Sequence, residues 1–310
     1  MSNLRFNDVR VMLADSRTHI RNTLKTALTH AGLENIEHAA RLDQVAEALD
    51  QGLGPDILIC DIGLDGGDAC GIIDDIRHNE IGRNPFMCIL GITWNPTELE
   101  VERVINSGID LLVAAPMSPK QILDRVESLV RNRLPWAITG DYIGPDRRKG
   151  SDRAQNLPLV SVPNTLKEKA MGTYDASRVR SDIAHAVNDL AARKIGRQAI
   201  TITELADLIV SQSSLTGPTM VKSHVDRLFG LVTDLDRRAA KRGFTHISEL
   251  CAACVTVVRK MRDADAPPPD KDVRLLKHLA LAIRTAMTPA GGAELIAHDI
   301  AQTVIGAGSG

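Results

Sequence analysis

Short apolar runs alternate with amphipathic stretches over the first 135 residues. The run at 9–14 has the length of a strand, and the stretch 18–31 after it places Ile20, Leu24 and Leu28 on one helical face. Further apolar runs lie at 36–39, 57–60, 87–92 and 111–114, and helical patterns cover 42–51, 70–78, 98–107 and 119–133. Five strands alternating with five helices predict an α/β fold with a doubly wound, five-stranded parallel sheet.

The pattern changes after residue 135. Residues 136–174 contain several prolines and glycines and the charged run 146–149, with little periodicity, and this composition predicts a linker with docking contacts. From residue 175 the chain is rich in alanine, and helices are expected at 176–193, 202–211, 219–242, 247–262 and 271–287. The predicted organisation is therefore a domain at 1–135, a linker at 136–174 and an all-helical output or dimerisation module at 175–310.

Composition and charge exclude several classes of protein. Of the 310 residues, 44% are hydrophobic and only 3% aromatic, which favours a globular, helix-rich protein over a β-sandwich. No apolar run approaches the ~20 residues that span a bilayer, and the N-terminus is polar, so we expect a cytoplasmic protein without a membrane segment. Five cysteines in apolar segments argue against a disulfide framework.

Polar side chains stand where the predicted strands end. Asp15 ends the first strand, with Ser16 next to it, Asp61 ends the third, and Thr93 ends the fourth. Ligands bind outside the carboxyl ends of strands in an open α/β sheet, so these residues are expected to share one crevice. Two carboxylates there can hold Mg²⁺, and a hydroxyl beside them can bind a phosphoryl oxygen. This set is typical of an aspartyl-phosphate site.

The same residues resemble a known family. The segment 13–15 (LAD) precedes a helix with Arg21, and the segment 55–61 (PDILICD), Thr93 and the pair 115–116 (AP) follow in order. Residues 8–133 are thereby similar to the flavodoxin-like receiver domain of bacterial two-component response regulators. A shorter segment, 142–148 (YIGPDRR), is similar to a tail that follows receivers in some bacterial proteins.

The resemblance implies roles for individual residues. Asp61 would be the phosphoacceptor and Thr93 the switch residue. Asp15, Asp61 and the carbonyl of Gly63 would hold Mg²⁺. A histidine kinase or phosphotransfer protein would be the partner that supplies the phosphoryl group.

Two positions depart from the family pattern. Ser16 stands where most receivers have a second acid, and Ala115 stands where most have a lysine; Lys120 is too far along the chain to replace it. Losing a carboxylate weakens the metal site, and losing the ammonium removes a charge that would pair with the phosphoryl group. The degraded site predicts that Asp61 reacts slowly, if at all.

The helical half carries weaker signals. Cys251 and Cys254 have the spacing of a redox or metal pair but lie in an apolar helical pattern, so they are interpreted as small buried residues. His185 and His278 have no ATP-binding boxes after them, which excludes a histidine kinase. No clustered acid, metal or nucleophile motif follows residue 135, and we expect a protein that is not an enzyme.

Two interpretations of the helical half stay open. The first is docking of an unidentified partner protein or homodimerisation through an apolar stripe that includes Ile183 and Leu190. The alternative is a DNA-binding transcription regulator with a helix-turn-helix-like segment at 201–231. Residues 191–262 hold 12 Lys/Arg against 6 Asp/Glu, which permits nucleic-acid binding, but the connector at 210–217 is too long for the motif. Partner docking is the preferred interpretation.

Overall fold

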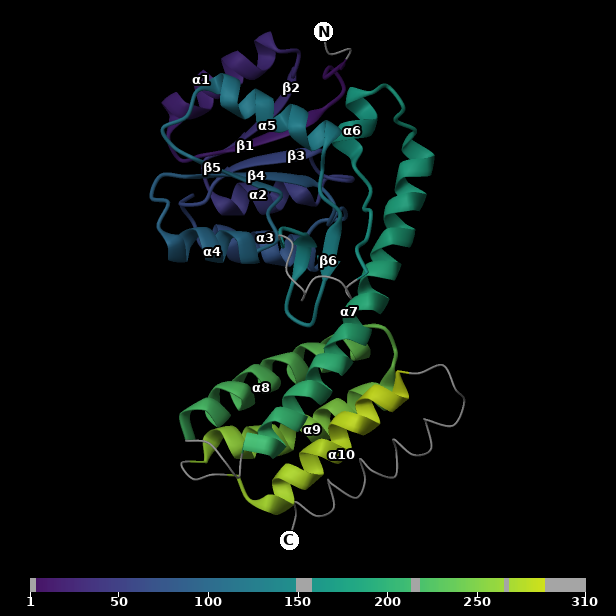
Figure 1. The fold of residues 1–310 in the computed structure, drawn as a ribbon. Coiled ribbons are helices and arrows are strands. Elements are labelled where there is room, and N and C mark those ends of the chain that lie inside the picture. Colours follow the sequence, from purple (N-terminus) through teal and green to yellow (C-terminus); the bar gives the residue numbers. More distant parts are fainter. Residues whose placement is uncertain (1–3, 149–157, 213–217, 265–267, 288–310) are drawn as a thin grey trace. The chain divides into compact units, whose positions relative to one another are not determined.

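A five-stranded parallel sheet forms the centre of the N-terminal part of the chain (Figure 1). The computed structural model describes residues 4–148, 158–212, 218–264 and 268–287. The strand order is β2-β1-β3-β4-β5, and all four neighbouring pairs are parallel. The strands are β1 (Arg10–Ala14), β2 (Asn35–Ala39), β3 (Ile57–Asp61), β4 (Cys88–Thr93) and β5 (Leu111–Ala114). The predicted doubly wound sheet is confirmed.

Helices cover both faces of this sheet, as its apolar strands require. The helices α1 (Thr18–His30) and α5 (Pro119–Arg131) lie on one face and pack on side chains such as Leu13 and Ile59. The other face is covered by α2 (Leu42–Leu49), α3 (Ala69–Arg77) and α4 (Glu98–Asn106). Buried side chains therefore line both sides of the central strands β1, β3 and β4, whereas the edge strand β2 exposes Glu37 and His38.

The segment expected as a linker contains ordered structure. The strands β6 (Trp136–Ile138) and β7 (Ile143–Pro145) form an antiparallel hairpin, and the helix α6 (Thr165–Ala170) follows. Trp136 is fully buried, and Leu166 of α6 is buried in the core beneath α1 and α5. The hairpin lies against Gly108, where a Cβ would come within 2.4 Å of the Ile143 carbonyl oxygen. The compact unit therefore extends beyond the expected boundary at residue 135.

The helix α7 (Ala176–Gln212) replaces two expected helices. A break was expected between residues 193 and 202, but α7 runs through that stretch, which includes Gly196, so that expectation was wrong. Ile195, Ala199 and Ile202 are buried on one face of this stretch. Their packing outweighs the cost of about 1 kcal/mol that an interior glycine carries.

The apolar stripe on the first half of α7 has a partner within the chain. Val179, Ile183 and Leu190 are buried in a cluster with Trp136 and Ile143 of the hairpin. The stripe was expected to be uncovered, and that expectation was wrong because the hairpin was not foreseen. Self-association of the helical half stays a prediction.

The chain divides into two compact units, one comprising Met1–Ile138 and Tyr142–Leu190 and the other Thr139–Asp141 and Ala191–Gly310. In the second unit the last part of α7 packs with α8 (Pro218–Lys241), α9 (Thr245–Asp263) and α10 (Asp270–Ala286) around one hydrophobic core. Cys251 and Cys254 are buried in that core as free thiols, as interpreted from the sequence. Across the described helices, none is long and apolar enough to cross a membrane.

Candidate functional site

The sheet brings three predicted site residues to one edge. Asp15 directly follows β1, Asp61 ends β3, and Thr93 ends β4; β3 lies between the other two strands and pairs in parallel with both. All three residues are buried, with exposed fractions of 1%, 5% and 1%. Two carboxyl groups and a hydroxyl group are therefore held at the carboxyl ends of three adjacent strands.

Arg17, which the sequence analysis did not single out, bridges the two carboxylates. Its Nε donates to Asp15 Oδ1 at 2.8 Å and its Nη2 to Asp15 Oδ2 at 2.8 Å, a two-pronged ion pair. The same Nη2 also donates to Asp61 Oδ2 at 2.6 Å. The backbone N–H of Arg17 adds a further hydrogen bond to Asp15 Oδ1 at 2.8 Å. One guanidinium group thus lies between the two acids that were expected to hold a metal.

Trp94 holds this guanidinium from a second side. The Cζ atom of Arg17 lies 4.0 Å from the centroid of the indole ring, which is a cation–π contact. Trp94 follows Thr93 directly, so the end of β4 that supplies the hydroxyl also supplies the aromatic cover. The indole is 41% exposed, whereas the carboxylates on the other side of Arg17 are buried.

The electrostatics follow from this geometry. Burial raises the pKa of Asp61, and the neighbouring Asp15 carboxylate adds to that effect, while the Gly63 N–H and Arg17 oppose it. The pKa of the Arg17 guanidinium is raised, chiefly by its hydrogen bonds to Asp15. A buried carboxylate with a raised pKa needs the positive charge beside it to remain ionised.

Thr93 directs its hydroxyl toward α4. Its Oγ1 donates to Glu100 Oε1 at 2.7 Å and accepts the Asn95 N–H at 3.3 Å. The hydroxyl predicted to contact a phosphoryl group is therefore bonded to a helix that packs beside the site.

The remaining predicted positions surround the two acids. The Gly63 N–H donates to Asp61 Oδ1 at 3.2 Å. Ser16 is half-buried, and its carbonyl oxygen accepts a hydrogen bond from Arg21 at 3.0 Å. Ala115 follows β5 and packs beside the core under α1 and α5. The Asp61 oxygens are thus engaged by Gly63 and Arg17.

The described side chains do not fit Mg²⁺ at this position. Mg²⁺ requires near-octahedral oxygen ligands, and here the space between Asp15 and Asp61 is spanned by a group that only donates hydrogen bonds. Within residues 4–148, 158–212, 218–264 and 268–287, no group of three or more His, Cys, Asp or Glu side chains is placed to hold a metal ion.

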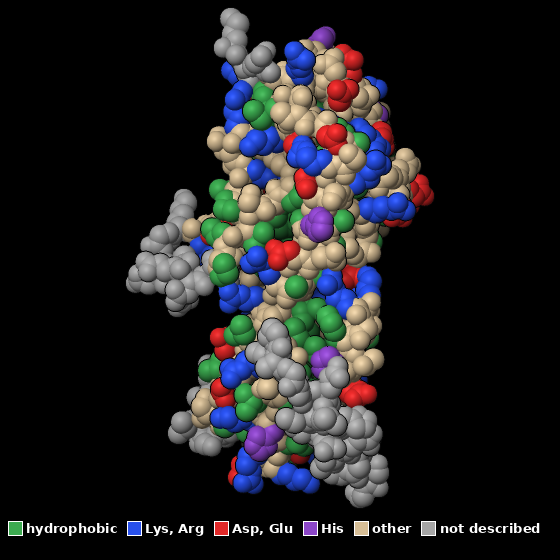
Figure 2. Space-filling model, turned by 90° about the vertical axis from the view of Figure 1, so that its right-hand side faces the viewer, with side chains coloured by type: hydrophobic (Ala, Val, Ile, Leu, Met, Phe, Trp, Pro, Cys, Tyr) green, Lys and Arg blue, Asp and Glu red, His purple; other side chains and the backbone are tan. Residues whose placement is uncertain are grey.

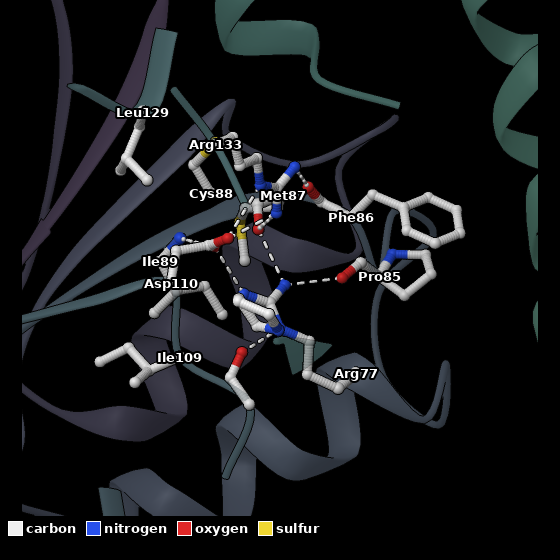
Figure 3. Close-up of polar contacts among 12 residues, drawn as sticks. Arg77, Pro85, Phe86, Met87, Cys88, Ile89, Ile109, Asp110, Leu129 and Arg133 are labelled. Carbon is white, nitrogen blue, oxygen red and sulfur yellow. Dashed lines mark hydrogen bonds and ion pairs between the residues drawn. The ribbon is translucent and has the colours of Figure 1, made fainter. Parts of the chain in front are cut away.

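A second ionic cluster lies at the amino ends of the strands (Figure 3). Asp110, just before β5, accepts hydrogen bonds from Arg77 Nη2 and Arg133 Nε, each at 2.8 Å, and from the Ile89 N–H at 2.8 Å. The side chains of Arg77 and Asp110 are 0% and 1% exposed. Burial alone would raise the pKa of Asp110, but Arg133 and Arg77 outweigh it and hold that pKa below its usual range.

Backbone carbonyls and the hairpin complete this cluster. Arg77 also donates to the carbonyl oxygens of Gly108, Pro85 and Met87, and Arg133 donates to that of Phe86. The Trp136 ring lies 4.8 Å from Arg77 Cζ and 5.5 Å from Arg133 Cζ. Each guanidinium nitrogen of Arg77 and Arg133 therefore donates to a carboxylate or carbonyl oxygen, and the Trp136 ring lies beside both groups.

The sequence held local signals for the residues that the sequence analysis missed. Arg17 lies two positions after Asp15, at the mouth of the expected crevice, and Trp94 directly follows Thr93. A cation and an aromatic side chain beside two strand-end acids could have indicated an internal ion pair. The cluster of Arg77, Asp110 and Arg133 had no such signal, because its members are far apart in sequence and at helix or strand boundaries.

Comparison with known proteins supports the receiver resemblance. Residues 11–127 match the family described as response regulator receiver domain. The phosphate regulon transcriptional regulatory protein PhoB of Escherichia coli K12 is 23% identical over 129 residues, which are 42% of this chain and 55% of PhoB. This chain thus spans about half the length of that relative.

Solved structures of receiver domains also match. The chemotaxis response regulator CheY4 of Vibrio cholerae is 20% identical and covers 39% of this chain and 98% of its own, with a TM-score of 0.35. The receiver domain of the sensor histidine kinase PA1611 from Pseudomonas aeruginosa PAO1, described with a magnesium ion in its active-site cleft, is 19% identical and covers 39% of this chain and 94% of its own, with a TM-score of 0.34.

The family match lies over the sheet whose carboxyl-end edge carries Asp15, Asp61 and Thr93. The order of strands and helices, the buried acids and the family match thus agree on the same part of the chain. Residues 11–127 form a response regulator receiver domain.

Proposed function

We propose that the chain is a response-regulator-like signalling protein that acts through protein–protein contact. The observation that carries the proposal is the meeting of Asp15, Asp61 and Thr93 at one edge of a receiver-domain sheet. The helical second unit is the proposed output module. Histidine kinases or phosphotransfer proteins are the proposed partners of the receiver domain.

Asp61 is the proposed phosphoacceptor. In such a transfer, an Asp61 oxygen forms a P–O bond as the P–N bond to a donor histidine breaks, and the released imidazole takes up a proton from solvent. In the resting arrangement Asp61 Oδ1 accepts from Gly63 and Oδ2 accepts from Arg17 at 2.6 Å. Because the nucleophile is engaged, and because Ser16 and Ala115 stand where most receivers have an acid and a lysine, the reaction is proposed to be slow.

Thr93 is the proposed switch residue, acting through its hydrogen bond to Glu100. A phosphoryl group on Asp61 would compete with the Glu100 carboxylate for the Thr93 hydroxyl. Release of Glu100 would free the first turn of α4, whose N-cap is the side chain of Thr97.

The geometry of the second unit favours partner docking over DNA binding. In the helix-turn-helix-like segment 201–231, the α8 residues Val221, Val225 and Leu228 are buried in the core of the bundle, and α8 continues to Lys241. Arg237 and Arg238 pair with Asp234 of the same helix. On the face drawn in Figure 2, basic and acidic side chains are interspersed. DNA binding stays as the second candidate because the relative PhoB is named a transcriptional regulator.

Two measurements on the full chain test the proposal. Intact-mass spectrometry after acetyl phosphate treatment should show at most slow addition of one phosphoryl group, lost in Asp61→Asn. Rapid, stoichiometric addition would contradict the slow site. A gel shift with genomic fragments should show no retarded band, whereas a band that weakens steeply with added salt would support the DNA-binding alternative instead.

Binding of the partner class can be measured directly. Purified transmitter domains of histidine kinases from the same genome should bind the immobilised full chain, and Asp61→Asn should retain that binding because the contact does not depend on the transfer. Absence of binding to all of them, together with a salt-sensitive gel shift, would overturn the proposed output.

A further inference from the structure

The acidic pocket of the receiver domain already contains a cation. Arg17 makes three hydrogen bonds to the Asp15 carboxylate, two from the guanidinium and one from the backbone, and one to Asp61. The planar guanidinium group matches a carboxylate in a fixed two-pronged geometry, which a lysine ammonium cannot reproduce. The pocket is therefore arranged around this particular side chain.

The contact is buried on its inner side and partly covered on its outer side. Asp15 and Asp61 on the inner side are 1% and 5% exposed, and the indole of Trp94 covers the outer side with its centroid 4.0 Å from Arg17 Cζ. The Arg17 side chain itself is 30% exposed. A guanidinium between two buried acids and an aromatic ring has lost most of its water, which strengthens each of these attractions.

Charge and ligand number argue that this cation takes the place of a metal. Two carboxylates leave a charge of −2, which Arg17 halves, and Ser16 supplies no further carboxylate. A divalent ion would have to break both salt bridges and the cation–π contact, and the displaced guanidinium would remain tethered two residues away from Asp15, where it repels the ion. The side chains of this pocket fit a resident guanidinium and not Mg²⁺.

We propose that Arg17 is the built-in cation of this receiver domain, that it makes the acidic pocket independent of Mg²⁺, and that its removal turns the pocket into a divalent-metal site. The inference rests on the proposed function only in locating the reactive site at Asp61. Metal binding and phosphoryl addition are measured separately, so one can fail while the other stands.

Titration calorimetry of MgCl₂ into the full chain at constant ionic strength tests the proposal. The wild type should show no saturable heat, and Arg17→Met should bind Mg²⁺ at least about tenfold more tightly, because two buried acids lose their partner. Arg21→Met is the matched control: Arg21 is also a basic residue of the same segment, but it donates to the backbone carbonyls of Asp15 and Ser16, not to the carboxylates.

Each outcome decides the proposal. Tighter binding by Arg17→Met alone supports it. Equal affinities of wild type and Arg17→Met overturn it, and so does an equal gain in both variants, since that would reflect only the loss of one positive charge.

Tryptophan fluorescence provides a second readout that needs no variant at position 17. Displacement of Arg17 by Mg²⁺ would remove the cation from the Trp94 ring and change the emission of Trp94. Trp136 is fully buried against Arg77 and Arg133 at the amino-end edge of the sheet. The wild type should show no saturable change with Mg²⁺. A saturable change that disappears in Trp94→Phe would overturn the proposal even if Arg17→Met failed to fold.

Discussion

The two edges of the receiver sheet carry opposite ionic arrangements. At the carboxyl ends one cation, Arg17, bridges two acids, whereas at the amino ends one acid, Asp110, lies between two cations. The pKa of Asp61 is raised, chiefly by burial, and the pKa of Asp110 is held down because two guanidinium groups outweigh the burial. The first cluster holds an excess of negative charge and the second an excess of positive charge.

The two clusters also differ in how far they are shielded from solvent. The amino-end cluster is covered by Trp136 and its remaining donors reach backbone carbonyls, so it fixes the ends of strands and helices in one geometry. The carboxyl-end cluster is open on the side of Trp94, which is 41% exposed. A closed cluster in which every guanidinium nitrogen donates a hydrogen bond contributes to structure, whereas an open one with surplus charge can exchange partners. The difference indicates a structural role for the amino-end cluster, while the proposed reactive site lies at the carboxyl-end edge.

Removing the cover of the amino-end cluster should have the largest effect. The fragment 1–135 lacks Trp136 and the α7 residues Val179 and Ile183 that pack with it, whereas 1–190 retains them. Loss of this packing costs several kcal/mol, so we expect 1–135 to melt about 10 °C or more below 1–190 by circular dichroism. Equal melting temperatures would show that the hairpin and α7 add nothing, as the boundary expected from the sequence implies.

Neutralising Asp110, the acid of the amino-end cluster, should cause the second largest loss of stability. Asp110→Asn leaves Arg77 and Arg133 buried without a counter-charge, and we expect the free energy of unfolding to fall by about 3 kcal/mol. Urea unfolding of the full chain can be followed by tryptophan fluorescence, since both tryptophans lie in the first unit. The exposed Asp124 on α5 supplies the control, Asp124→Asn, which should change little. A similar loss in both variants would contradict a special role for Asp110.

The contributions of Asp110 and Asp61 to the free energy of unfolding should change with pH in opposite directions. Asp110 has a lowered folded-state pKa, so its stabilising effect is complete above the unfolded pKa of about 3.9 and is lost as the pH falls further. Asp61 has a raised folded-state pKa, so the native state binds its proton first and gains stability as the pH falls from neutral toward about 4.

Urea unfolding at a series of pH values checks these signs. Relative to Asp61→Asn, the wild type should become more stable on acidification over that range. Relative to Asp110→Asn, the wild type should lose its extra stability only below about pH 4. A difference that moves in the same direction for both variants would remove the contrast between the two edges.

The smallest effect is expected at Thr93. Thr93→Val removes the buried hydrogen bond to Glu100, and we expect a loss of about 1 kcal/mol in the same urea assay. Glu100→Gln keeps an acceptor for the hydroxyl and should cost less. If Glu100→Gln were as damaging as Thr93→Val, the charge on Glu100 rather than the hydrogen bond would be what matters.

The sheet and its acids were predictable because their signals are local. A strand such as 57–61 is a continuous apolar run that ends in an aspartate, and the alternation of strands with helices indicates a parallel sheet. The hairpin was missed because β6 and β7 have three residues each, too few for a periodic pattern. The break expected in α7 was wrong because buried neighbours of Gly196 decide its conformation, and those neighbours come from α8 to α10.

The contents of the acidic pocket were only half predictable. Strand ends locate Asp15 and Asp61, but the rotamer that brings the Arg17 guanidinium between them depends on Trp94, which comes from another strand. The resemblance implied a metal between these acids, whereas the guanidinium that lies there is evident only from the three-dimensional arrangement.

Diffraction from crystals of the full chain soaked in Mn²⁺ tests the central claim most directly, because Mn²⁺ takes the same oxygen ligands as Mg²⁺ and gives an anomalous signal. If Arg17 fills the pocket, no anomalous peak should appear between Asp15 and Asp61, and electron density should show the Arg17 guanidinium bridging the two carboxylates. An anomalous peak at that position, with Arg17 turned away from Trp94, would contradict it.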